Sequence, residues 1–121
     1  MSVQISTELG KIEIDTQVIA TLAGAIAMEC YGLVGMSSRR TMKDGIADIL
    51  RRDNLSRGVE VRDDSGRTVI DLYIIVSYGT KISEVAHSVQ ERVKYALHTT
   101  LGMAVDEVNI YVQGVRGEMS S

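Results

Sequence analysis

Residues Thr68–Tyr78 read TVIDLYIIVSY, a run of β-branched, aliphatic and aromatic residues without glycine or proline. Such a run predicts a long β-strand. Because side chains alternate along a strand, one face carries five residues that we expect to line the core: Ile70, Leu72, Ile74, Val76 and Tyr78. The opposite face is mixed and carries Val69, Asp71, Tyr73, Ile75 and Ser77.

A second strand precedes this one in the chain. Val59 and Val61 alternate with polar residues, and the following stretch Asp63-Asp64-Ser65-Gly66 is rich in turn-forming residues. We therefore expect an antiparallel hairpin. The stretch lacks the spaced acidic ligands of a calcium loop, so it is interpreted as a turn alone.

One amphipathic helix is predicted before the hairpin, over Thr16–Tyr31, with Asp15 or Thr16 as its cap and Gly32 as its stop. Apolar residues recur along it at spacings of three and four, which gives it one buried stripe. The stripe consists of Val18, Ile19, Leu22, Ala23, Ile26, Ala27 and Cys30.

A second amphipathic helix is predicted after the hairpin, with Thr80 or Ser83 as its cap and Gly102 as its stop. Its buried stripe is Ile82, Val85, Ala86, Val89, Val93, Ala96 and Leu97. Its polar face carries Glu84, His87, Glu91, Lys94 and His98, which is typical of a solvated surface.

The remaining elements are shorter. Ile12 and Ile14 predict a strand with one buried face, Leu33–Ser38 an extended piece, and Val108–Val112 a last strand that ends near Gly114. A weak helix is predicted from the spacing of Met42, Ile46, Ile49 and Leu50.

These elements follow one another in the order β-α-(α)-β-β-α-β. The order predicts an α+β fold, a two-layer sandwich with the two main helices on one face of a mixed or antiparallel sheet. A chain of 121 residues suits a single domain, with a core at about 10–115 and a loose tail at 116–121.

The amino-acid composition disfavours several classes of function. The chain has five tyrosines and no tryptophan, phenylalanine or proline, and its net charge is −3, which disfavours binding to DNA or to single-stranded RNA. Cys30 is the single cysteine and excludes an intrachain disulfide. No secretory signal or membrane-spanning run is evident, so we expect a cytoplasmic protein.

Positive charge is concentrated between Ser37 and Gly58. This stretch contains six basic residues against three acidic ones, and the basic residues are Arg39, Arg40, Lys43, Arg51, Arg52 and Arg57. They could meet anionic lipid or an acidic partner. We favour the alternative, in which the apolar stripe of the weak helix packs on the sheet and the arginines are solvated.

Two stretches carry a family resemblance. Gly10-Lys11-Ile12-Glu13-Ile14, followed by Val18-Ile19 and Gly32-Leu33-Val34-Gly35-Met36, resembles the opening of the alkaline shock protein family. Tyr78-Gly79-Thr80-Lys81-Ile82, with Val89-Gln90 and Val108-Asn109-Ile110-Tyr111-Val112, resembles the rest of the family pattern in the same order.

The resemblance covers about 10–115 and implies a small cytosolic protein of Gram-positive bacteria, linked to cell-envelope homeostasis and stress. It implies, for some members, attachment to the membrane through a partner protein. It brings no catalytic residues and no cofactor, so the chain is expected not to be an enzyme.

The sequence offers only weak candidates for a metal site or a reactive nucleophile. Glu84 and His87 have the Glu-x-x-His spacing of di-iron bundles, but the motif occurs once and His98 is too distant to share a metal, so no metal site is predicted. Cys30 lies on an apolar stripe and is expected to be a buried, inert thiol. No phosphate-binding or nucleophile motif occurs in the chain.

The mixed face of the long strand is the candidate interface. We assign it to Val69, Tyr73, Ile75 and Tyr111, because tyrosine and aliphatic residues are typical of interface cores and a two-layer domain leaves one sheet face open. The alternative is that the weak helix or the tail covers this face within the monomer.

The leading hypothesis is a non-enzymatic adaptor or scaffold that forms a homo-oligomer or docks on a protein partner. That partner can be membrane-anchored, whereas direct membrane contact is disfavoured. The second hypothesis is an RNA-binding module of KH-like character, for which Gly32–Gly35 and Gly114–Gly117 have the spacing of the Gly-x-x-Gly clamp. An enzyme with a site built from scattered residues ranks third.

Overall fold

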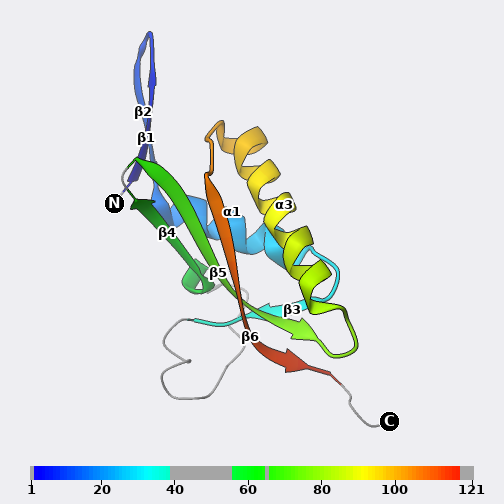
Figure 1. Cartoon of the computed structure of the whole chain (residues 1–121). Coiled ribbons are helices and arrows are strands. Elements are labelled where there is room, and N and C mark those ends of the chain that lie inside the picture. Colours follow the sequence, from blue (N-terminus) through cyan, green and yellow to red (C-terminus); the bar gives the residue numbers. More distant parts are fainter. Residues whose placement is uncertain (1, 39–55, 65, 118–121) are drawn as a thin grey trace.

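The computed structural model of the chain describes residues 2–38, 56–64 and 66–117 (Figure 1). Its elements are β1 (Ser2–Thr7), β2 (Gly10–Asp15), α1 (Thr16–Met28), β3 (Leu33–Met36), β4 (Val59–Asp64), β5 (Arg67–Ser77), α3 (Ile82–Leu101) and β6 (Glu107–Arg116). The weak helix predicted at 42–50 and the last residues of the predicted tail, 118–121, lie outside the described residues.

The strand predicted at Thr68–Tyr78 is β5, and it is the centre of a four-stranded mixed sheet. β6 runs parallel to it along one edge, from the pair Val69–Glu107 to the pair Ser77–Arg116. The other edge is shared by two antiparallel strands, β4 beside the first half of β5 and β3 beside the last part. The predicted α+β fold with a mixed sheet is therefore confirmed.

β3 and β4 lie almost end to end on their shared edge. After β3, the backbone N–H of Ser37 donates to the Tyr73 carbonyl at 2.9 Å, which continues the pairing with β5. Before β4, Gly58 lies so close to the end of β3 that an added Cβ would be 3.0 Å from the Cβ of Met36. The described residues on either side of 39–55 thus meet at the same edge of the sheet.

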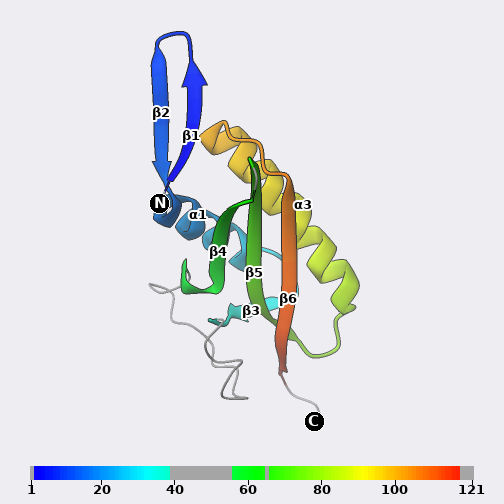
Figure 2. The ribbon, with the colours of Figure 1, turned by 60° about the vertical axis from the view of Figure 1, so that its left-hand side comes forward.

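Both helices pack on one face of the sheet, as predicted (Figure 2). The core contains four residues of β5 together with one stripe from each helix: Ile70, Leu72, Ile74 and Val76 of β5, Ile19, Ala23 and Ala27 of α1, and Val85, Val89, Val93 and Leu97 of α3. Asp15 caps α1, since its side chain accepts from the N–H of Gln17 at 2.7 Å. Gly102 ends α3 in the left-handed conformation.

Several predicted details were wrong. Val18 and Ile82, both assigned to buried stripes, are exposed because they lie at the solvent-facing side of the first helical turn. Tyr78 is also exposed, since β5 ends at Ser77 and the chain turns away. Neither Thr80 nor Ser83 caps α3: the cap position is Lys81, and the Thr80 hydroxyl donates to the Ser77 carbonyl at 2.7 Å.

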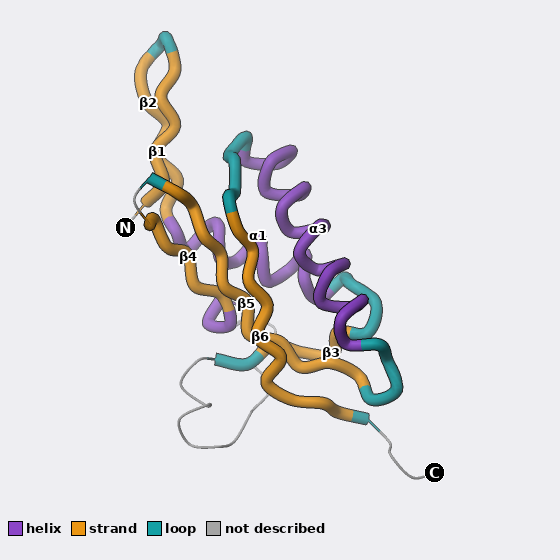
Figure 3. Tube along the Cα trace, viewed as in Figure 1, coloured by secondary structure: helices purple, strands orange, loops and turns teal. Residues whose placement is uncertain are grey.

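The strand predicted around Ile12 is β2, but its surroundings differ from the prediction. It pairs with β1, which was not predicted, to form a separate antiparallel hairpin that extends away from the main sheet (Figures 1 and 3). Ile12 is 51% exposed, and Leu9 at the turn is fully exposed. The buried face is confined to the half of the hairpin nearest the sheet, where Val3, Ile5 and Ile14 contact the core.

Candidate interaction surface

The sheet face opposite the helices carries most of the candidate residues, and we call it the outer face. The strand registers place its residues side by side: Glu60 and Arg62 of β4, Val69, Asp71, Tyr73 and Ile75 of β5, and Glu107, Asn109 and Tyr111 of β6. No described helix covers this face in either view of the ribbon (Figures 1 and 2).

A buried carboxylate lies at the centre of the outer face. Asp71 accepts from Arg62 through two bonds, at 2.9 Å from Nε and 3.3 Å from Nη2, and from Asn109 Nδ2 at 3.0 Å. Its side chain is 5% exposed. The hydrogen bond to Asp71, followed by the negative charge itself, raises the pKa of the Arg62 guanidinium. This network ties three neighbouring strands together on the outer face.

Two tyrosines stack beside this network. The rings of Tyr73 and Tyr111 are parallel to within 17° and their centroids are 5.0 Å apart. Tyr73 is 6% exposed and Tyr111 is 42% exposed, so the inner ring supports the outer one. Such stacked pairs contribute about 0.5 to 1.5 kcal/mol beyond their buried area.

Among the four residues predicted as an interface, Tyr111 alone is exposed in the structure. Val69, Tyr73 and Ile75 are buried within the chain. The accessible part of the outer face is therefore Tyr111 with its polar neighbours, among them the Arg67–Glu107 ion pair at 3.1 Å.

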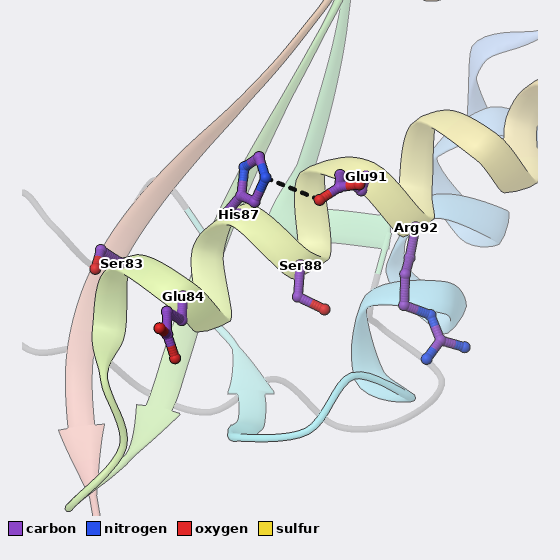
Figure 4. A pocket seen from close by; sticks show the side chains of 6 residues that line it. All are labelled: Ser83, Glu84, His87, Ser88, Glu91 and Arg92. Carbon is purple, nitrogen blue, oxygen red and sulfur yellow. Dashed lines mark ion pairs between the residues drawn. The ribbon is translucent and has the colours of Figure 1, made fainter.

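A shallow depression lies on α3, away from the outer face (Figure 4). It is lined by Ser83, Glu84, His87, Ser88, Glu91 and Arg92. His87 Nε2 contacts Glu91 Oε1 at 2.8 Å, whereas Glu84 faces Lys81 at 3.7 Å, so the Glu84–His87 pair does not act as a unit. Within the described ranges, no group of three His, Cys, Asp or Glu side chains could hold a metal ion.

Cys30 is buried as predicted, just after the end of α1. Its Sγ contacts the Ile26 carbonyl at 3.7 Å. Burial raises the pKa of the thiol, and the positive charge of Arg92 opposes this only in part. The thiol is therefore a poor nucleophile at neutral pH.

The predicted basic surface is only partly described. Arg39, Arg40, Lys43, Arg51 and Arg52 lie outside the described residues, and Arg57 is exposed in the short turn that leads into β4. This turn is held against the start of α1 by a bond from Gln17 Nε2 to the Ser56 hydroxyl at 2.8 Å.

The two Gly-x-x-Gly stretches do not have the setting of an RNA clamp. Gly32–Gly35 begins in the turn before β3 and continues into that strand, and Gly114–Gly117 lies at the end of β6. A clamp of the KH type lies between two helices. In the part of the chain that the structure describes, no helix is long and apolar enough to cross a membrane.

The network around Asp71 was not predicted from the sequence. The signal was present, since an aspartate in the middle of an apolar strand needs hydrogen-bond partners. The partners could not be named, because Arg62 and Asn109 belong to strands whose registers only the structure fixes.

The fold is a small α+β domain with both helices on one face of a four-stranded sheet and Tyr111 exposed on the other face. A family model matches residues 4–117, and it describes the alkaline shock protein 23 family, of cell envelope-related function. The chain belongs to this family, as the resemblance implied.

Relatives in two bacteria support this membership. The chain is 59% identical over 116 residues to the uncharacterized protein YloU of Bacillus subtilis (strain 168), covering 96% of this chain and 97% of that protein. It is 44% identical over 116 residues to the uncharacterized protein Spy1614 of Streptococcus pyogenes serotype M6, covering 96% of each. No solved structure matches the chain.

Proposed function

We propose that this chain is a non-enzymatic adaptor that acts in cell-envelope homeostasis by binding a protein partner through its outer face. The family has a cell envelope-related function, and its description names no reaction. The observation that carries the proposal is Tyr111, an exposed aromatic ring held in place by a buried one.

Tyr111 has the properties of an interface anchor. Tyrosine brings a large amphipathic surface at a small cost in side-chain entropy, and anchors of this kind dominate binding energy at interfaces. Stacking on Tyr73 fixes the ring before a partner arrives, which lowers the entropic cost of binding.

The polar groups around Tyr111 are also arranged for association. Asp71 is already satisfied by Arg62 and Asn109, so a partner can cover it without leaving a buried charge unpaired. Arg62 still has part of its surface exposed and can offer further donors to a partner. The outer face thus combines a rigid aromatic pair with satisfied polar groups beside it, and interfaces commonly combine the two.

The test is an affinity pull-down from cytosolic and membrane fractions, each with and without nuclease treatment. The bait is the tagged chain as wild type, as Tyr111→Asp, and as Tyr95→Asp, a matched control whose tyrosine lies exposed on α3. Circular dichroism checks that all three baits are folded.

We expect the wild type and Tyr95→Asp to capture the same protein and Tyr111→Asp to lose it. Equal capture by all three baits would contradict the assignment of the outer face. Capture that disappears on nuclease treatment would favour the RNA-binding alternative.

A further inference from the structure

β6 is an edge strand, along which the Val108 carbonyl accepts from Gln90 Nε2 of α3 at 2.8 Å. It is ten residues long, and among the described strands it pairs only with β5. Its charged residues are at its two ends, Glu107 and Arg116, and the residues between them are uncharged. Val112 and Val115 are exposed. A long uncharged edge presents unpaired backbone N–H and C=O groups and is a template for pairing with another strand.

The opposite edge of the sheet is different. β4 is shorter than β6, and it carries Glu60, Arg62, Asp63 and Asp64 in its six residues. Charges along an edge strand discourage pairing with another chain. The β6 edge is therefore the better candidate for association.

A bulge in β6 decides which of its side chains share a face. Ile74 pairs with Val112 but the next residue, Ile75, pairs with Gly114, so Gln113 is an extra residue. As a result Glu107 pairs with Val69 and Arg116 pairs with Ser77. Val69 and Ser77 are eight residues apart on β5 and so lie on the same face, which puts Glu107 and Arg116 on that face as well. Without the bulge, Glu107 and Arg116 would point to opposite faces.

The two charged ends of β6 are also placed symmetrically. Tyr111 pairs with Tyr73, which is the midpoint between Val69 and Ser77. A twofold axis beside Tyr111 would therefore bring Glu107 of one copy opposite Arg116 of the other, on the same face of the sheet. Opposite charges at facing positions stabilise an antiparallel pair.

The strand register points to a second copy of this chain as the occupant of the β6 edge, and we propose that two copies pair their β6 strands in antiparallel fashion about this axis. All the facing pairs then match in face: Glu107 with Arg116, Val108 with Val115, Asn109 with Gly114, Ile110 with Val112, and Tyr111 with its own copy. The strand is complementary to itself in charge and in apolar character.

This dimer deepens the proposed function and rests on it. Joining the β6 strands merges two outer faces into one surface, with two stacked Tyr73–Tyr111 pairs beside each other at its centre. A partner would then meet a doubled aromatic anchor on a continuous sheet, which gives higher affinity through two linked contacts.

The first test measures the dimer by light scattering and sedimentation over a dilution series. Glu107→Arg and Arg116→Glu each place like charges opposite one another twice in the dimer, so each should weaken it by roughly tenfold. The double variant restores opposite charges and should recover the dimer. It does not restore the Arg67–Glu107 pair within the chain, so the recovery reports on the contact between copies.

The second test measures the register by disulfide cross-linking in a Cys30→Ala background, which removes the single native cysteine. Two Tyr111→Cys side chains face each other, with Cα atoms about 5 Å apart, within the disulfide range. Two Glu107→Cys side chains would be roughly 26 Å apart along the strands. Tyr111→Cys should cross-link rapidly, and Glu107→Cys should not.

A wild-type chain that stays monomeric at its highest soluble concentration would overturn the dimer, and so would a double charge variant no better than the single ones. Tyr111-dependent capture of a partner by a monomer would overturn this inference and leave the proposed function standing. A dimer with the expected cross-link but no captured partner would overturn the proposed function alone.

Discussion

Gly32 is the position where a single added carbon should do most damage. It lies between α1 and β3 with a φ of +88°, a conformation that costs other residues about 1 to 2 kcal/mol. An added Cβ would also lie 2.7 Å from Val85 Cγ2 and 3.3 Å from Thr80 Cγ2. Val85 is buried and β-branched, so it cannot easily turn away.

The structure offers a control that separates these two costs. Gly79 has a similar φ of +92°, but an added Cβ there meets nothing within 4 Å. Gly79→Ala should therefore lower the free energy of unfolding by the conformational cost alone, about 1 to 2 kcal/mol. Gly32→Ala adds an overpacking cost, typically about 1 to 3 kcal/mol, so it should be the more destabilising by about 2 kcal/mol.

The assay is urea unfolding followed by far-UV circular dichroism, with Val85→Ala added to complete a double-mutant cycle. Removing the Val85 methyls should relieve the clash, so the double variant should be more stable than the sum of the single effects predicts. Equal losses for Gly32→Ala and Gly79→Ala, or strict additivity with Val85→Ala, would refute the reasoning.

Two further predictions concern buried polar groups. Burial raises the pKa of the Cys30 thiol above its ordinary 9.0, so the folded state holds this proton more tightly than the unfolded state does. The free energy of unfolding should therefore fall as pH rises above about 9, and more steeply in the wild type than in Cys30→Ala. The same dependence of stability on pH in both proteins would contradict this. Asp71→Ala should lower the free energy of unfolding by about 2 kcal/mol because Asn109 and Arg62 lose a buried acceptor. The control Asp64→Ala, at the exposed end of β4, should change it little. Equal denaturant midpoints for the two variants would show that the network contributes nothing.

The sequence predicted the core well because the core follows simple periodicities. The alternation in β5 and the three- and four-residue spacing in α1 and α3 identified the buried residues that meet between sheet and helices. One of the two predicted stop signals is confirmed, since Gly102 ends α3 in the left-handed conformation that its residue type favours, whereas α1 ends at Met28, before the predicted stop at Gly32.

The sequence predicted less about elements held by unusual contacts. β1 has only Val3 and Ile5 as apolar residues and is a strand because β2 pairs with it, which a single short pattern does not reveal. The favoured hypothesis also took Ile75 and Tyr73 to be accessible on the outer face, whereas both are buried, because alternation shows which side a residue faces and not what covers it.

The most direct test of the account uses the tyrosines as reporters of the interaction surface. Mild chemical nitration, read out by mass spectrometry, is compared between the dilute purified chain and the chain captured with its assembly from cells. We predict that Tyr111 is modified in the dilute chain and protected in the assembly, while Tyr31 and Tyr95, both exposed away from the outer face, react equally in both states. Protection of Tyr31 or Tyr95 with Tyr111 still reactive would place the interface on the helix side and contradict the account.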